Sequence, residues 1–258
     1  MAVLSLHFLA KTVIVQILID HNDKHTEYRE RAQGIIRQLQ TDHYASVSED
    51  ILETFTENYP SIVSDELLCV LAPPHLRKLQ LFGFTNVKDI ENIHQLFRKS
   101  SKIETLSLDG CDGLISIDLC YFLCKTLTHL NSVTMESCPP ITDEHVQFLL
   151  MYCPSLTHLN IAWNEDITDD VFNLQSLLRR TSQSAADQEW TAPSLNSVDV
   201  SGCRFLTSNC IRHLAKLCGS KLQALNVSYT QGTTWRLPYS LPCLKTVRCW
   251  IEAGRRKD

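Results

Sequence analysis

One short motif recurs along most of this chain at a nearly constant spacing. Its pattern is aliphatic-x-x-aliphatic-x-aliphatic, and in the complete copies it is followed by x-x-Cys or x-x-Asn. Complete copies begin at Ile103, Leu130, Leu156 and Leu195, and weaker copies at Leu76, Leu222 and Leu244. The steps between these positions are 27, 27, 26, 39, 27 and 22 residues. A unit this short cannot bury its apolar face alone, so the recurrence predicts a stack of repeats that share one core.

Each unit predicts a short strand, a turn at the Cys or Asn, and an amphipathic helix, as at residues 143–152 and 208–217. A Cys or Asn at the turn can hydrogen-bond backbone groups where the chain leaves the strand. The 39-residue step is one repeat with a polar surface insertion, at about residues 179–193. We therefore expect an α/β solenoid over residues 71–250, with a curved parallel sheet, helices on its convex side and a tail at 251–258. Residues 1–70 form a separate helical segment that caps the solenoid.

The details of one repeat point to a known family. Cys138-Pro-Pro-Ile141-Thr142-Asp143 precedes a helical stretch, and Cys153-Pro154-x-Leu156-x-x-Leu159 follows it. This arrangement resembles the cysteine-containing leucine-rich repeat family over about residues 70–250. The resemblance implies a substrate-binding arm of a cullin-RING ubiquitin ligase, a role that comes from the family and not from the spacing.

Composition narrows the class of protein. The chain has 24 Lys and Arg against 29 Asp and Glu, a net charge of −5, which disfavours a dedicated nucleic-acid binder. Its 11 cysteines are odd in number and contain no Cys-x-x-Cys pair, so we expect reduced thiols and a cytoplasmic or nuclear location. Residues 4–19 are apolar but are interrupted by polar residues, and they predict neither a signal peptide nor a membrane span.

The segment before the repeats carries two further resemblances. Residues 5–14 are similar to the elongin-binding BC-box, with Leu6, Ala10 and Ile14 as its positions, and Leu6 as the anchor in a partner's groove. Pro60, Val63 and Leu67 are similar to the cullin-2 box. Amphipathic helices are expected between the two, at about 26–39 and 48–58. The order of these features resembles the zygotic-arrest family of cullin-2 substrate receptors, which implies elongin C and cullin-2 as partners.

The chain departs from the family pattern at two points, and each of the two boxes has an alternative interpretation. Ala10 stands where the family commonly has Cys, and the gap between the boxes is longer than is typical. The first helix could instead only cap the solenoid, and Pro60 could simply occupy a first helical turn, where proline is favoured. An F-box beginning at Pro60 would have only about fifteen residues before Leu76, which is too few.

Residues that lie between the inward-facing aliphatic positions of each strand, or just after it, are expected to face a partner. The candidates for contact with a protein target are Asp109, Glu136, His158, Asn160, Trp163 and Asp199. Trp163 stands at a position after the strand that usually holds a small or polar residue, and it is either a ligand contact or packs on a neighbouring turn. The three carboxylates either form an acidic strip for a basic or free amino-terminal segment or are simply solvated.

The sequence contains none of the common phosphate-loop, dinucleotide-binding, nucleophile-elbow or zinc-protease motifs. We expect no enzyme activity, no catalytic residue, and no metal or cofactor. The predicted function is a non-catalytic substrate-recognition adaptor of a cullin-RING ubiquitin ligase. The alternative is a stand-alone interaction scaffold with no ligase role, or an F-box-type adaptor.

Overall fold

The computed structural model describes residues 45–58, 63–85, 87, 89–176, 178–179, 193–231, 241 and 243–248. Several predictions fall outside this described part of the chain. They concern Leu6, Ala10, Ile14, the helix at 26–39, Pro60, the interior of the insertion at 179–193, and the tail at 251–258.

The described residues contain a parallel sheet whose strands pair in the order of the sequence. The strands are β1 (Lys78–Gln80), β2 (Thr105–Ser107), β3 (Ser132–Thr134), β4 (His158–Asn160), β5 (Ser197–Asp199), β6 (Ala224–Asn226) and β7 (Thr246–Arg248). The register places the central residue of each strand beside the central residue of the next, as Leu106 beside Val133. From β1 to β6 these central side chains are buried, so each repeat contributes the same position to the core.

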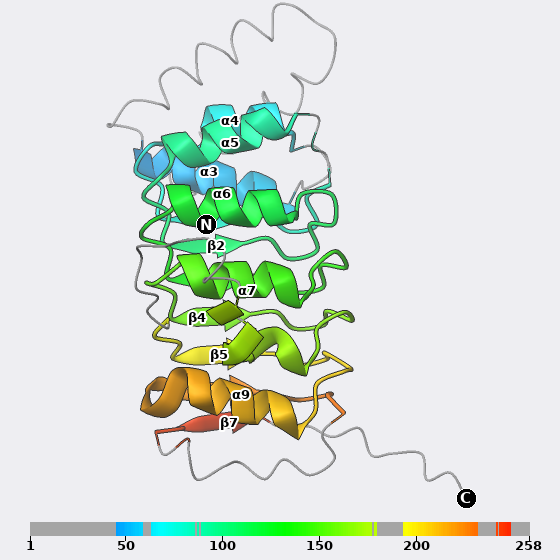
Figure 1. Ribbon diagram of the computed structural model, residues 1–258. Coiled ribbons are helices and arrows are strands. Elements are labelled where there is room, and N and C mark those ends of the chain that lie inside the picture. Colours follow the sequence, from blue (N-terminus) through cyan, green and yellow to red (C-terminus); the bar gives the residue numbers. More distant parts are fainter. Residues whose placement is uncertain are drawn as a thin grey trace, which may run out of the picture.

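Helices cover one face of this sheet, as Figure 1 shows for the column formed by α5, α6, α7 and α9. The helices are α3 (Ala45–Asn58), α4 (Asp65–Leu71), α5 (Ile90–Lys99), α6 (Ile117–Thr126), α7 (Asp143–Tyr152) and α9 (Ser208–Cys218), with 3-10 helices η2 (Asp169–Phe172) and η3 (Gly219–Lys221). The α/β solenoid predicted from the repeats is confirmed, and α7 has the predicted bounds. Among the described residues, no helix is long and apolar enough to cross a membrane.

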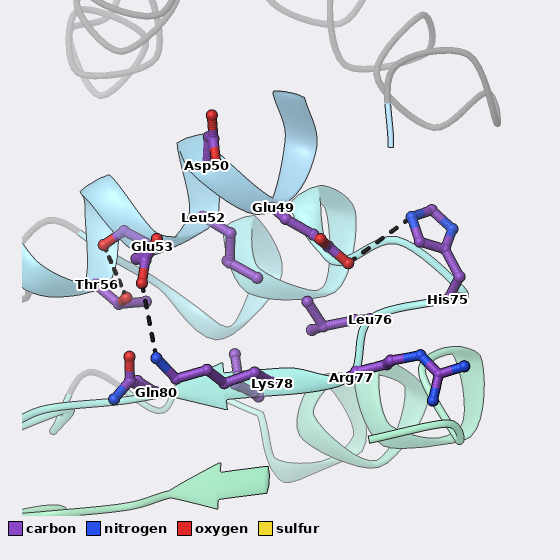
Figure 2. A pocket seen from close by; sticks show the side chains of 11 residues that line it. Glu49, Asp50, Leu52, Glu53, Thr56, His75, Leu76, Arg77, Lys78 and Gln80 are labelled. Atoms are coloured by element: carbon purple, nitrogen blue, oxygen red, sulfur yellow. Dashed lines mark hydrogen bonds and ion pairs between the residues drawn. The ribbon is translucent and has the colours of Figure 1, made fainter. Parts of the chain in front are cut away.

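The beginning of the solenoid is closed by α3 and α4. Helix α3 lies along the free edge of β1 (Figure 2) and buries Ile51, Leu52 and Phe55, each at most 2% exposed. Val63 is 1% exposed and belongs to the same core, while Leu67 is partly buried against it. The core is therefore continuous across residue 70, and α4 packs on α5 as one repeat helix packs on the next.

The turns after β2, β3, β4 and β5 are each held by one buried polar side chain. The thiols of Cys111, Cys138 and Cys203 donate hydrogen bonds to backbone carbonyls of the preceding repeat, at 3.4, 3.0 and 3.2 Å. Asn164 occupies this position in the fourth repeat. Its amide nitrogen donates to the carbonyls of Met135 and Ile161, both at 2.8 Å, and its oxygen accepts from the Cys138 backbone N–H at 2.8 Å. The predicted role of Cys and Asn at the turn is confirmed.

A second set of bonds links the helix starts of neighbouring repeats. The Asp143 carboxylate accepts from the backbone N–H and the hydroxyl of Thr168, the residue that caps η2. Asp169 does the same for Thr207, the N-cap of α9. Because a helix N-terminus leaves backbone N–H groups without partners, these aspartates fix the position of each helix relative to the one before it.

We predict that Asn164→Ala lowers the free energy of unfolding by about 2–4 kcal/mol, because it leaves buried backbone groups unsatisfied and creates a cavity. Asn164→Cys, the residue that other repeats use here, is expected to cost less, since a thiol can still bond one carbonyl. Urea unfolding followed by far-ultraviolet circular dichroism measures both. Equal losses for the two variants would contradict the role assigned to the turn hydrogen bonds.

The buried thiols are predicted to resist alkylation. Burial raises the pKa of Cys111 and Cys218 to about 12 and that of Cys138 and Cys203 to about 11, so the reactive thiolate is scarce at neutral pH. Cys243 is exposed. Brief treatment of the native protein with iodoacetamide at pH 8, followed by peptide mass spectrometry, is expected to label Cys243 and leave the other four thiols unmodified until urea is added. Rapid labelling of Cys138 in the folded protein would contradict this expectation.

Candidate functional site

The face of the sheet that the helices leave uncovered carries the candidate target-binding residues, and we call it the open face. Each strand from β2 to β6 contributes three positions to this face: its first residue, its last residue, and the residue two positions after its last one. These are Thr105, Ser107 and Asp109; Ser132, Thr134 and Glu136; His158, Asn160 and Ala162; Ser197, Asp199 and Ser201; and Ala224, Asn226 and Ser228. None of these positions holds Lys or Arg. Lys78 on β1 and Arg248 on β7 lie at the two ends of this surface.

The next residue in each turn has a left-handed backbone. This position is occupied by Gly83, Gly110, Ser137, Trp163, Gly202 and Tyr229, whose φ angles are 57, 69, 53, 60, 74 and 60°. Along the first five turns its N–H donates to a carbonyl of the following repeat, as Trp163 does to Ser201 at 2.7 Å. The ladder of backbone bonds thus continues past the strands. Glycine fits this conformation best, and a bulky residue here is unusual.

The two bulky residues at this position form one aromatic pair, Trp163 and Tyr229. Their ring centroids are 5.6 Å apart with planes inclined by 32°. Gly202 lies between them in the stack, and a Cβ placed on it would come within 2.4 Å of the Trp163 ring. The rings remain 49% and 46% exposed. Trp163 therefore packs on the neighbouring turn, the second of the two alternatives, and still presents ring surface to solvent.

The sequence singles out Trp163 but does not reveal its pairing with Tyr229. The available signal was the position of both residues in the repeat, one residue before the Cys, Asn or Thr of the turn, with a glycine at this position in the repeat between them. The contact is not evident from either residue alone, because the two rings are 66 positions apart in the chain and meet only when the repeats stack.

Asp109 is held by uncharged groups of its own and the next repeat. Its carboxylate accepts hydrogen bonds from the hydroxyls of Ser107 at 2.7 Å and Thr134 at 3.1 Å and from the backbone N–H of Glu136 at 2.7 Å. These bonds connect β2 to β3 on the open face. Asp109 therefore has a structural part in addition to its negative charge.

The other predicted polar residues are arranged in the same way. Asn160 donates to the Glu136 carboxylate at 3.2 Å, and Asn226 donates to the Asp199 carboxylate at 2.8 Å. His158 is exposed, and its Nδ1 is 2.8 Å from the Thr157 hydroxyl. The structure thus joins Glu136 with Asn160 and Asp199 with Asn226, while target contact by any of these residues stays a prediction.

A hollow of about 220 Å³ lies over β5, β6 and β7. It is lined by Ser197, Val198, Asp199, Ala224, Leu225, Asn226, Thr246 and Arg248. Asp199 and Asn226 come from the strands that lead into the turns of Gly202 and Tyr229. The open face is therefore hollowed next to the repeats that hold the aromatic pair.

A larger hollow of about 430 Å³ lies between α3 and β1, as Figure 2 shows. Glu49 and Glu53 of α3 face His75 and Lys78 across it, with nitrogen to oxygen distances of 3.8 Å in both pairs. Glu49, Asp50, Glu53, Arg77 and Lys78 all line the hollow, so it presents both negative and positive charges to a ligand.

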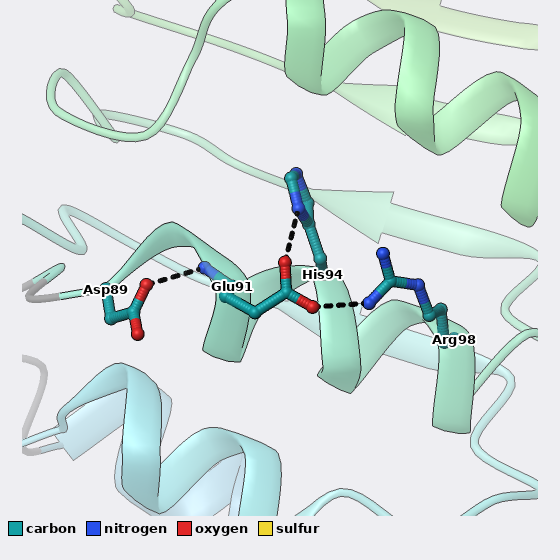
Figure 3. Close-up of polar contacts among 4 residues, drawn as sticks. All are labelled: Asp89, Glu91, His94 and Arg98. Carbon is teal, nitrogen blue, oxygen red and sulfur yellow. Dashed lines mark hydrogen bonds and ion pairs between the residues drawn. The ribbon is translucent and has the colours of Figure 1, made fainter.

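On the helical face, polar side chains along α5 bond one another (Figure 3). The Glu91 carboxylate is 2.6 Å from the Arg98 guanidinium and 3.4 Å from His94, and the hydrogen bond from Arg98 lowers the Glu91 pKa. Arg98 and His94 in turn lie against the Phe122 ring of α6. This group joins two repeats. In the described part of the chain, no three His, Cys, Asp or Glu residues are grouped so that they could hold a metal ion.

We predict that Gly202→Ala costs more stability than Gly83→Ala, although both positions have a left-handed backbone. At Gly83 nothing lies within 4 Å of the added Cβ, so the cost is backbone strain of about 1–2 kcal/mol. At Gly202 the Cβ also displaces the Trp163 ring, which adds about 1 kcal/mol or more.

Urea unfolding of the two variants measures this difference, and the same pair made in a Trp163→Gly background is the control. In the Trp163→Gly background, Gly202→Ala and Gly83→Ala should lower the free energy of unfolding equally, because the ring is gone and the left-handed turn is retained. A difference that persists without the ring would show that the Trp163 contact is not its cause.

Comparisons with known proteins agree with this architecture. Residues 152–170 match the leucine-rich repeat family. F-box/LRR-repeat protein 5 of Salmo salar is 29% identical over 86 residues, which are 33% of this chain and 11% of that protein. The match therefore spans only a small part of this relative's length.

Two solved structures resemble the chain. The crystal structure of the Rad7 and Elc1 complex in yeast has a TM-score of 0.52 at 16% identity, over 97% of this chain and 69% of the matched chain. Internalin C2 of Listeria monocytogenes has a TM-score of 0.44 at 17% identity, and the match covers 72% of this chain and 76% of the internalin chain. At 16% identity the likeness to the yeast structure concerns the fold alone. The sheet order, the turn hydrogen bonds and the match of residues 152–170 together show the fold of a leucine-rich repeat solenoid.

Proposed function

We propose that this chain is a non-catalytic substrate-recognition adaptor of a cullin-RING E3 ubiquitin ligase. In this role, residues near the N-terminus bind the ligase and the open face recruits a protein target. Other subunits carry out the chemistry, and this chain contributes position. The proposal includes elongin C and cullin-2 as partners, a zygotic-arrest type of receptor, and a cytoplasmic or nuclear location.

The main observation in favour is the open face itself. Most of its positions hold polar side chains, a hollow lies over its last three strands, and two of the turns that follow its strands carry half-exposed aromatic rings. Large exposed aromatic residues are enriched where proteins bind proteins. This supports recruitment of a protein by the scaffold.

The ligase connection has separate support. Leu6, Ala10 and Ile14 follow the BC-box pattern, and the solved structure that resembles 97% of the chain contains Rad7 in complex with Elc1. The relative from Salmo salar bears the name of an F-box protein, so it favours a ligase role without favouring elongin C. Cullin-2 is inferred only from the box at Pro60, Val63 and Leu67.

One observation favours the stand-alone scaffold as the second candidate. Val63 is buried and Leu67 is partly buried in the core, so these two side chains already serve the packing of α4. Contact of Val63 with cullin-2 would require it to leave that core. Because α3 and α4 close the first repeat, at least part of the N-terminal segment acts as a cap.

The test is capture of elongin C and cullin-2 by the full chain and by the double variant Leu6→Asp, Ala10→Asp. The matched control is Lys11→Asp, Thr12→Asp, which adds the same number of carboxylates to the other side of the predicted helix. We expect the wild type and the control to capture both partners. The first variant should lose at least about tenfold, because it places charge in an apolar groove.

Circular dichroism establishes that each variant is folded before its capture is compared. Absence of capture by the wild type, or equal capture by the folded Leu6→Asp, Ala10→Asp variant, would refute the elongin-linked adaptor and leave the stand-alone scaffold. Capture of elongin C without cullin-2 would keep the BC-box assignment and remove the assignment of the second box.

A further inference from the structure

The aromatic pair offers exposed ring surface that a cation could contact. Trp163 rests on Gly202 and beside Tyr229, and 49% of its surface remains open to solvent. The faces of indole and phenol rings attract Lys and Arg side chains through the ring quadrupole. Holding a tryptophan in the left-handed turn costs stability, and such costs cluster at binding sites.

The charges of the open face favour the same kind of ligand. Asp109, Glu136 and Asp199 lie on β2 to β5 or directly after these strands, and the groups that bond their carboxylates are hydroxyls, amides and backbone N–H groups. In the described part of the chain, none of the three has a Lys or Arg partner. Among the described residues, no cationic side chain balances their negative charge, which is available to a bound cation.

The ends of the surface limit where such a ligand can lie. Lys78 lies on β1, and Arg248 lines the far wall of the hollow over β5 to β7. Arg248 repels a positively charged ligand, whereas the charge of Lys78 is paired with that of Glu53. The favourable region therefore extends from Asp109 to the aromatic pair, and a phosphate-bearing strand would meet carboxylates along its length.

We propose that the open face binds an extended protein segment rich in Arg or Lys, with one cationic side chain on the Trp163–Tyr229 pair and others near Glu136 and Asp109. This deepens the proposed function by naming the class of target, and it rests on the open face being the recruiting surface. The ligand is recognised by its positive charge together with an extended backbone that can follow the sheet.

The experiment measures fluorescence anisotropy of labelled nonapeptides with the full chain. One peptide contains three arginines separated by Gly-Ser, and three others have lysine, neutral citrulline or glutamate in their place. We expect the arginine and lysine peptides to bind, the citrulline peptide to bind at least about tenfold more weakly, and the glutamate peptide not to bind. Binding should weaken as salt rises from 50 to 300 mM, because exposed charges are screened.

Variants locate the site. Trp163→Gly removes the ring but suits the left-handed turn, and it should weaken binding of the arginine peptide about five- to twentyfold. Glu136→Gln removes a charge while keeping an oxygen that accepts from Asn160, and it should weaken binding and flatten the salt dependence. Tyr121→Ala on α6 is the control, since Tyr121 is 47% exposed on the helical face, and it should change nothing.

Absence of binding by both cationic peptides at millimolar concentration would overturn the proposal. So would equal affinity for the citrulline peptide, which would indicate stacking without charge, or unchanged affinity in both Trp163→Gly and Glu136→Gln. The assay contains no ligase subunit. Peptide binding without elongin capture therefore keeps this inference and refutes the adaptor, and the reverse result refutes only this inference.

Discussion

The stacking of this molecule depends on one polar side chain in each turn of the second to fifth repeats, which reaches back to a carbonyl of the preceding repeat. Cys111, Cys138, Asn164 and Cys203 are at most 1% exposed, and each donates a hydrogen bond to a backbone carbonyl of the preceding repeat. An unpaired carbonyl at that depth would cost as much as a lost hydrogen bond. Phe84 occupies the same position in the first repeat, where no preceding strand of the described chain offers a carbonyl.

The repeat pattern was sufficient to predict the strands, their parallel order and the helical layer, because each depends on the period of the apolar residues. Helix α7 has its predicted bounds, and α9 ends at Cys218 instead of residue 217. The division at residue 70 is less clear in the structure than in the sequence. Val63 and Leu67 resemble a cullin box in their spacing, but the same spacing also suits the apolar side of a repeat helix, and both contact the core.

The candidate site was only partly predictable, because its geometry arises between repeats. The sequence indicates that Asp109, Glu136 and Asp199 lie on one face, but their hydrogen bonds to Thr134, Asn160 and Asn226 depend on the stacking. The aromatic pair required knowledge of the backbone. Trp163 and Tyr229 meet only because both turns are left-handed and the turn between them has no side chain.

The fourth repeat joins two layers of the molecule at one place. On the helical side, the four-residue η2 packs between α7 and α9 and is fixed by Asp143 on one side and by its own Asp169 on the other. On the opposite side, the turn of the same repeat holds Trp163. A ligand that touches Trp163 and Tyr229 would bridge the fourth and sixth repeats, and by mass action it would oppose local unfolding of the segment between them. A greater fraction of ligand-bound protein would then mean a folded solenoid that opens less often.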